Sequence, residues 1–417
     1  MLDYSFAAAE IMARCDALGK VSQQSTCLDR RYLTKEHKQA NTLVSGWMTE
    51  AGMTTWQDAA GNQWGRYNAG HTNAPRLIIG SHLDTVPNGG KYDGMLGVIT
   101  PISLIAQLSR DQVQLPFHID VVGFGDEEGT RFGSTLLGSF ALTGEWKETW
   151  RDLTDEDGIT LEEALLSFGS SFENIKSATL TPENILGYLE IHIEQGPVLE
   201  NENLPIGIVS AIAGAKRYQI SLSGMAGHAG TVPMDMRYDA LCAASEMILA
   251  VEAHANKAQD VVATVGKIEN APNGVNVISG RTLFSLDIRS EQDDKRDTVL
   301  ADILQEFNVI AEKRNLIVDI QQTHSANAVH CDPQLKNDIV NGVVETGISP
   351  KILPSGAGHD AMAMASICPV AMLFTRCKGG ISHHPGESIA EEDVRYTVEA
   401  LHHSIANIGK RYTGESA

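Results

Sequence analysis

The sequence predicts an α/β protein in which a larger domain, with a mixed sheet and helices on both faces, carries a smaller inserted α+β domain. Its 417 residues are too many for one hydrophobic core of average size, which favours two domains. Apolar runs typical of buried strands alternate with helical patterns over most of the chain. In the middle, a series of alternating strands interrupts this order.

The larger domain is predicted from three apolar runs, RLIIG (Arg76–Gly80), FHIDVVGF (Phe117–Phe124) and VAMLF (Val370–Phe374). Each run ends beside a polar segment, and these segments are Ser81–Val86, Asp126–Gly129 and Thr375–His384. Ligand sites in open α/β sheets gather beyond the carboxyl ends of strands. We therefore expect a functional site where these three segments meet.

The inserted domain is predicted from about Arg217 to Gln321. Alternating strands (RYQISLSG, VVATVGKIE and TLFSLDIRS) are separated there by helical patterns near Asp239–Asn256 and Asp294–Arg314. A strand-helix-strand-strand-helix-strand order within roughly 100 residues is typical of a small α+β domain. We expect residues 1–214 and 329–417 to form the larger domain and 215–328 the insert.

Composition limits the partners of the chain. The formal charge is 32 − 53 = −21, so the surface repels phosphate backbones and anionic lipids, and no nucleic acid partner is expected. No apolar stretch reaches the roughly 18 residues that span a bilayer, so no membrane anchor is expected. The six cysteines form no CxxC pair, and the N-terminus lacks the basic and apolar regions of a signal peptide. We expect a cytoplasmic protein with reduced thiols.

Histidines and acids with the spacing of metal ligands are the strongest chemical signal. His82 and Asp84 stand two residues apart after the first strand, and Asp93 follows in a glycine-rich loop. The other pieces are DEEG at Asp126–Gly129, EIHIEQGP around His192, and GGISHHPGE with His383 and His384. Imidazole and carboxylate ligands together suit zinc or manganese.

These residues predict a centre of two divalent metal ions, Zn²⁺ or Mn²⁺, in each chain. A carboxylate shared between two ions holds them at roughly 3.5–4 Å, and we assign this role to Asp93. His82 and His192 complete one site, and Glu128 and His383 the other. Asp84 is expected to accept the second N–H of the His82 ring and to fix its tautomer.

Glu127 is the candidate for the chemistry itself. Two adjacent glutamates at a strand end cannot both point at the same metal ion, so if Glu128 is a ligand, Glu127 is free to face the attacking water. As a general base, Glu127 would take a proton from that water and pass it to the departing nitrogen.

Each motif alone also has an ordinary structural interpretation: a histidine at a strand end is usually hydrogen-bonded, a Glu-Glu pair solvated and an HH pair exposed. Several of them after apolar strands of one chain are not expected together by chance. The chain lacks GxxxxGK[ST], HExxH and GxSxG motifs, and GFGDEEG (Gly123–Gly129) has the spacing GxGxxxG with acids that repel a pyrophosphate. Serine catalysis and nicotinamide chemistry are therefore excluded.

The ordered series GSHLDTV, KYDG, DEEG, HIEQGP and ISHHPGE resembles the two-metal amidohydrolase family of aminoacylases, N-carbamoyl-L-amino-acid hydrolases, β-ureidopropionases and allantoate amidohydrolases. The resemblance runs from about Gly61 to the C-terminal helix. The motif HIEQGP resembles the corresponding motif of the carbamoyl-cleaving branch of this family. Dipeptidases and deacylases usually have an acid in place of His192. Within that branch, GMAGHAGTVPM (Gly224–Met234) and SGAGHDAMAMA (Ser355–Ala365) resemble allantoate amidohydrolases.

The resemblance implies an enzyme that hydrolyses a linear amide or amidine C–N bond. Allantoate is the expected substrate, with ammonia and carbon dioxide released in ureide catabolism. N-carbamoyl-L-amino-acid hydrolase or β-ureidopropionase activity is the alternative, and a non-catalytic metal-binding scaffold is an alternative of another class. A scaffold should have lost Glu127 or a ligand, and none is missing.

The resemblance also implies that the insert is a dimerisation and lid domain of a homodimer. Arg289 would bind the substrate carboxylate through its planar guanidinium, and Asn276 would add an amide donor. His228 resembles the family histidine that reaches the partner subunit's active site and stabilises the oxyanion. The alternatives are a salt bridge to Asp287 for Arg289 and a turn position for His228. Further substrate-binding candidates are Gln195, Arg217 and His359.

Overall fold

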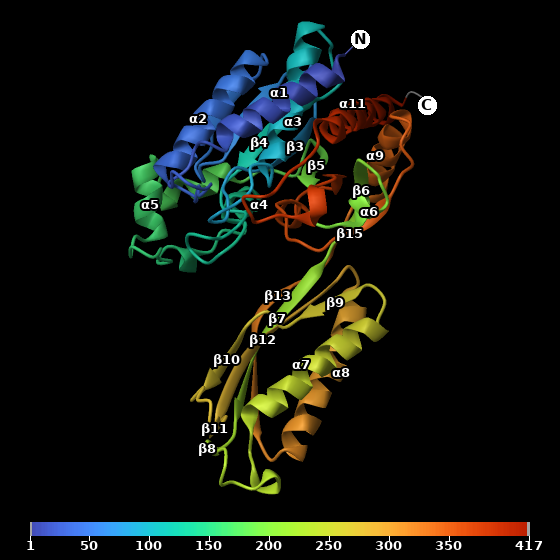
Figure 1. Cartoon of the computed structure of the whole chain (residues 1–417). Helices are drawn as coiled ribbons and strands as arrows, with labels where there is room; N and C mark the ends of the chain where they lie inside the picture. Colours follow the sequence, from blue (N-terminus) through green and yellow to red (C-terminus); the bar gives the residue numbers. More distant parts are fainter. Residues whose placement is uncertain (1, 415–417) are drawn as a thin grey trace. The chain divides into compact units, whose positions relative to one another are not determined.

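The computed structural model describes residues 2–414, which divide into two compact units (Figure 1). The first unit takes in the described residues up to Ser210, Cys331–Leu353, and those from Ala357 onward. The second unit consists of Ala211–His330 together with Pro354–Gly356. The sequence pattern gives no sign of that three-residue segment, because it lies far along the chain from the rest of its unit.

The sheet of the first unit is mixed, as the sequence predicts. Its four central strands are parallel, in the order β4 (His118–Phe124), β3 (Arg76–His82), β5 (Ile185–Ile193) and β16 (Val370–Thr375). Antiparallel strands flank them, namely β1 (Thr54–Gln57), β2 (Gln63–Tyr67) and β6 (Ile206–Ile212). The short β14 (Val329–His330) and β15 (Ile352–Ser355), whose residues fall wholly or partly in the second unit, extend this sheet by pairing with β6. The carboxyl ends of the four parallel strands share one edge of the sheet.

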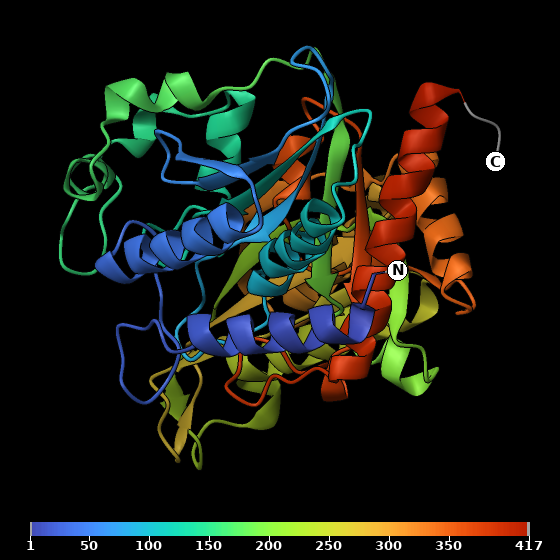
Figure 2. The same cartoon turned by 90° about the horizontal axis from the view of Figure 1, so that it is seen from above.

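Helices cover both faces of this sheet (Figures 1 and 2). One face carries α1 (Tyr4–Leu18), α2 (Lys35–Glu50), α3 (Met95–Arg110), α9 (Pro333–Glu345) and α11 (Glu391–Thr413). The other carries the shorter α4 (Leu137–Thr143) and α10 (Ala361–Met364). The unit also contains α5 (Leu161–Phe168), α6 (Val198–Asn201) and 3-10 turns at Glu148–Trp150, Phe172–Ala178 and Lys378–Gly380.

Helix α3 contains the longest apolar run of the sequence, with Pro101 inside it. Almost all of its side chains are buried, because it packs on β3 and β5 beneath α1. The apolar run therefore belongs to a core helix. None of the helices between residues 2 and 414 is long and apolar enough to cross a bilayer.

The second unit is an antiparallel sheet with two helices on one face. The strand order is β10 (Ile268–Ala271), β12 (Arg281–Ser290), β7 (Gly214–Ser223) and β13 (Ile317–Ala326), and β9 (Val261–Thr264) also pairs with β12. The helices are α7 (Ala240–Lys257) and α8 (Asp293–Lys313). A separate two-stranded piece pairs β8 (Gly227–His228) with β11 (Val277–Ile278), and a 3-10 turn covers Met234–Met236.

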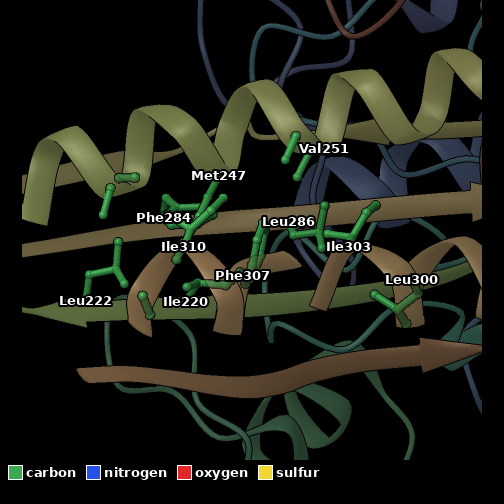
Figure 3. Packing of buried hydrophobic residues seen from close by; sticks show 14 of the residues in the cluster. Ile220, Leu222, Met247, Val251, Phe284, Leu286, Leu300, Ile303, Phe307 and Ile310 are labelled. Carbon is green, nitrogen blue, oxygen red and sulfur yellow. The ribbon is translucent and has the colours of Figure 1, made fainter. Parts of the chain in front are cut away.

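Strand β12 sends alternate side chains to the two faces of this sheet. Phe284 and Leu286 are buried beneath α7, and the Phe284 ring meets Phe307 of α8 edge-on at 5.7 Å (Figure 3). Asp287 and Arg289 therefore point to the opposite face, which neither helix covers. That open face carries the polar residues discussed below.

One predicted strand is wrong, because VVATVGKIE forms two strands, β9 and β10. Four steps along the chain separate Thr264 from Ile268, whereas three separate their partners Asp287 and Phe284 on β12. The extra residue makes a bulge between Thr264 and Ile268. Alternation of apolar residues alone did not indicate this shift in register.

Candidate metal centre

Loops at the carboxyl edge of the first unit's sheet bring the predicted metal ligands together. His82 ends β3 and His192 lies one residue before the end of β5. Ligand atoms lie within 4.8 Å of one another in three overlapping groups, which are His82, Asp93 and His192; His82, Glu127 and Glu128; and Asp93, Glu128 and His383. The residues of these groups come from four separate segments of the sequence.

Asp93 lies at the centre of these groups. Its Oδ1 is 3.1 Å from His192 Nε2 and 3.6 Å from His82 Nε2. Its Oδ2 is 3.4 Å from His383 Nε2, which in turn is 3.6 Å from Glu128 Oε1. Each oxygen of Asp93 thus faces a different group of side chains, as a carboxylate shared between two ions must.

Backbone contacts orient both buried imidazoles. His82 Nδ1 is 3.0 Å from the carbonyl oxygen of Asp84, and His192 Nδ1 is 2.9 Å from that of Ile193. A carbonyl can only accept, so we assign the proton of each neutral ring to Nδ1, which leaves the Nε2 lone pair directed at Asp93. Gly94 makes room for this arrangement, since a Cβ there would lie 2.5 Å from the His82 ring.

The Asp84 carboxylate lies beside His82, as predicted, but the hydrogen bond to the ring goes to the Asp84 backbone instead. The Asp84 Oδ1 lies 3.7 Å from His82 Nδ1, and the ring is held instead by the Asp84 backbone carbonyl. The carboxylate accepts the backbone N–H groups of Glu127 (3.1 Å) and Glu128 (3.2 Å). The chain turns towards Asp84 at Asp126, whose φ is 63°. Asp84 therefore holds the loop that carries both glutamates.

Carboxylates crowd this region and oppose one another's ionisation. Burial and then the charge of Asp93 raise the pKa of Glu128 to about 8, and burial raises the pKa of Glu127 well above its ordinary value. Burial also opposes ionisation of Asp93, but the His192 and His82 imidazoles hold its pKa well below the ordinary value. Bound divalent cations relieve such repulsion, so the donor set fits a metal centre.

Two residues of the GGISHHPGE segment were missed by the sequence analysis. Glu387 is buried, and its Oε1 accepts the backbone N–H groups of Tyr92 (2.8 Å) and Asp93 (3.1 Å). Ser382 donates to Asp93 Oδ2 at 2.7 Å, and Gln195 Nε2 donates to the same oxygen at 3.0 Å. The sequence signal that could have found Glu387 and Ser382 was their proximity to His383.

His359, a predicted substrate-binding residue, lies beside the metal centre. Its ring is buried and meets the His192 ring edge-on, with 4.5 Å between the centroids. Burial, and then the neighbouring His192, hold the pKa of His359 well below its ordinary value. A neutral ring is therefore expected at this position.

Arg217 and Arg289 come together on the open face of the second unit, where both contact Asp287. Asp287 accepts from Arg289 through Nε (2.7 Å) and Nη2 (2.9 Å), and from Arg217 through Nε (2.8 Å). Arg289 Nη1 also donates to the carbonyl of Gly356 at 2.7 Å. These groups line a cavity of about 530 Å³, together with Thr264 and other residues of the same unit.

His228 and Asn276 lie at the other end of β12 from Arg289. His228 pairs with Val277, and the backbone N–H of Ala229 donates to the carbonyl of Asn276 at 2.9 Å. Eight steps along β12 separate Arg281 from Arg289, a length of about 26 Å at the usual rise of a strand. Arg289 and Asn276 of one chain therefore do not meet.

Comparisons with known proteins show to which family this chain belongs. Residues 78–407 match Peptidase family M20/M25/M40. The chain is 40% identical to an allantoate deiminase of Arabidopsis thaliana, over 92% of this chain and 79% of that protein. It is 37% identical to an N-carbamoyl-L-amino acid amidohydrolase of Geobacillus stearothermophilus, over 93% and 95%.

The structure also resembles that of an amidase of the hydantoinase/carbamoylase family from Burkholderia multivorans. The TM-score is 0.91 at 30% identity, with 96% of this chain and 98% of that one covered. The chain therefore belongs to Peptidase family M20/M25/M40, and it is an amidohydrolase. The predicted family and fold class are confirmed.

Proposed function

We propose that this amidohydrolase cleaves a carbamoyl C–N bond and that allantoate is its substrate, with ammonia and carbon dioxide released. The observation that carries the proposal is the group of ligand atoms around Asp93, with Glu127 beside it. The relatives named allantoate deiminase and N-carbamoyl-L-amino acid amidohydrolase support a carbamoyl group as the point of cleavage. N-carbamoyl-L-amino acids and ureidopropionate are the alternative substrates.

The proposed centre holds two divalent ions, zinc or manganese. His82, His192 and Asp93 Oδ1 would hold one ion, and Glu128, His383 and Asp93 Oδ2 the other. Bound there, the ions would polarise the substrate carbonyl and lower the pKa of a water molecule. Glu127 takes the proton of the attacking water and delivers it to the departing nitrogen, while Asp84 keeps the Glu127 backbone in place.

The Arg289 side chain is suited to bind the carboxylate of the substrate despite its salt bridge. A guanidinium has five N–H groups, and three of those of Arg289 are used by Asp287 and Gly356. One N–H remains on each of Nη1 and Nη2, and this edge matches a carboxylate in two-pronged geometry. The salt bridge and substrate binding, which the sequence presented as alternatives, are therefore compatible.

We further propose a homodimer in which the partner subunit supplies both His228 and Asn276. Within one chain these residues lie a strand's length from Arg289, so all three serve one substrate only if they come from two chains. His228 would stabilise the oxyanion and Asn276 would donate to the substrate. Exposed apolar side chains close to them in sequence, Met225, Met234 and Val275, favour a protein partner on this part of the unit.

Mixing two inactive variants tests the dimer. A Glu127→Gln chain combined with a His228→Ala chain should regain part of the activity, because one site of the heterodimer joins an intact Glu127 to the partner's intact His228. An Asn276→Ala chain should complement Glu127→Gln in the same way. An Arg289→Ala chain should not, because Arg289 would serve its own subunit. No recovery in the first two mixtures, with subunit exchange demonstrated, would contradict the proposal.

A substrate panel tests the proposed activity. Ammonia release is measured from allantoate, N-carbamoyl-L-amino acids and ureidopropionate, each with Zn²⁺ and with Mn²⁺. The proposal expects the highest kcat/KM with allantoate. Faster release from a carbamoyl amino acid would favour the alternative substrate, and no release from any of the three would favour a metal-binding scaffold. A cytoplasmic location stays a prediction.

A further inference from the structure

Arg30 is completely buried in the first unit and has no role in the site described above. Its backbone lies along the loop that leads from His82 to Asp93. The Arg30 N–H donates to Thr85 Oγ1 at 3.0 Å, and the Thr85 N–H donates to the Arg30 carbonyl at 3.0 Å. Two residues earlier, Leu28 forms a bridge with Gly89 of the same loop. The segment containing Arg30 is therefore paired with the loop that carries the predicted ligands.

The guanidinium of Arg30 contacts three parts of the chain at once. Nε donates to the carbonyl of Leu83 at 2.7 Å, and Nη2 to the sulfur of Met95 at 2.7 Å. Nη1 donates to the carbonyls of Leu18 (2.7 Å) and Val21 (2.9 Å), at the end of α1. The carbonyl end of a helix carries partial negative charge and favours a cation.

Two of these contacts, those with Leu83 and Met95, lie at the two ends of the loop that leads from His82 to Asp93. Leu83 is the residue between His82 and Asp84, and Met95 follows Asp93 by two positions at the start of α3. The planar, rigid fork of an arginine can join such separate acceptors in one fixed geometry, whereas the single ammonium of a lysine cannot. Arg30 thus ties the two ends of the loop to each other and to α1.

Arg296 in the second unit offers a contrast. Both arginines are buried, but Arg296 forms ion pairs with Asp293 and Asp297. Arg30 has no carboxylate within ion-pair distance among residues 2–414, and its guanidinium donates only to carbonyls and a thioether. A cation buried without an ion pair is costly, so geometry rather than stability accounts best for Arg30.

We propose that Arg30 is a positioning residue of the metal centre, which fixes His82 and Asp93 relative to each other through the backbone at Leu83 and Met95. The inference rests on the proposed metal centre. Arg30 does not touch a metal ion or substrate in this account. Its effect is to keep His82 and Asp93 in place before a metal ion binds.

The test is a titration of the metal-free full chain with Co²⁺, which binds to such ligands and has a visible absorption spectrum that reports ligand geometry. The variant is Arg30→Lys, which keeps the charge and loses the fork. The Co²⁺ dissociation constant should rise about 10- to 100-fold, as for other residues that orient ligands, and the visible bands should change. Arg296→Lys is the matched control and should bind Co²⁺ with the wild-type constant and spectrum.

The proposal would be overturned if Arg30→Lys lowered the thermal stability but left the Co²⁺ dissociation constant and spectrum unchanged. Arg30 would then be a purely structural residue. If Arg30→Lys does not fold, Met95→Leu decides, since it removes only the sulfur acceptor at similar volume. A rise in the dissociation constant of about threefold is expected there, as for loss of a single weak hydrogen bond, and no rise would overturn the proposal. Wild-type protein that binds no Co²⁺ would instead refute the metal centre itself.

Discussion

The metal centre of the first unit and the arginine cluster of the second carry unbalanced charges of opposite sign. At the metal centre, buried carboxylates crowd together, and the pKa of Glu128 rises to about 8 because burial and Asp93 oppose its ionisation. On the open face of the second unit, one carboxylate serves two guanidinium groups, a net charge of 2 − 1 = +1. Although burial opposes it, Arg289 and Arg217 hold the pKa of Asp287 below its ordinary value.

This difference teaches which ligand each region is prepared to bind. The first has an excess of buried negative charge and favours cations. The second has an excess of positive charge and two N–H groups of Arg289 left over, and it favours an anion. The proposed substrate, a carboxylate cleaved at a metal centre, would require both kinds of region.

The largest expected effect separates chemistry from metal binding. Glu127→Gln should keep the metal content of the wild type and lower kcat by about two to four orders of magnitude, because a carboxamide cannot accept the proton of the water. Metal content by elemental analysis and the rate of ammonia release are measured on the same preparation. Activity near the wild-type value would remove Glu127 from the mechanism.

The next effect is the stabilisation of the first unit by bound metal, which should not extend to the second unit. All five tryptophans of the sequence, Trp47, Trp56, Trp64, Trp146 and Trp150, lie in the first unit. Zn²⁺ at 100 times its dissociation constant should stabilise the folded state by about 2.7 kcal/mol, seen as a shift of urea unfolding followed by tryptophan fluorescence.

Phe307→Ala is the matched control for this shift, because it opens the core of the second unit. It should destabilise that unit by about 3–5 kcal/mol and leave the shift caused by Zn²⁺ unchanged. A tryptophan transition that does not respond to Zn²⁺ would place the bound metal outside the first unit.

A smaller effect concerns the anion site. Asp287→Asn should lower kcat/KM for a carboxylate substrate about tenfold, as for loss of about 1.4 kcal/mol of charge-assisted bonding to Arg289. The added positive charge attracts the substrate, but charge effects at such partly exposed sites rarely exceed about 1 kcal/mol. The carboxamide analogue of the substrate should be little affected.

Asp319→Asn is the control for this variant, since Asp319 is exposed on β13 and lies on the same open face. It should leave kcat/KM for both substrates unchanged. Equal losses for the carboxylate and the carboxamide in Asp287→Asn would mean that Asp287 supports the fold rather than the orientation of Arg289.

The fold class and the grouping of the predicted ligands could be predicted from the sequence because each ligand stands next to a recognisable strand. The carboxyl ends of β3, β4, β5 and β16 share one edge, so His82, Glu128, His192 and His383 had to lie near one another. Periodicity and position were enough for this part of the site.

Other features depend on backbone directions that side-chain patterns do not encode. The Asp84 carboxylate meets amide groups of Glu127 and Glu128 because the chain turns at Asp126. The acceptors of Arg30 are mostly backbone carbonyls from separate segments, which leave no signature in residue type. The bulge between Thr264 and Ile268 likewise follows from the register with β12.

The most direct test of the central claim is a titration of Zn²⁺ or Mn²⁺ into protein first freed of metal by a chelator, with ammonia release from allantoate measured at each step. The account predicts no release from the metal-free protein and a maximal rate at two ions per chain. Release that survives complete removal of metal, or no release from allantoate, carbamoyl amino acids or ureidopropionate with both ions bound, would contradict it.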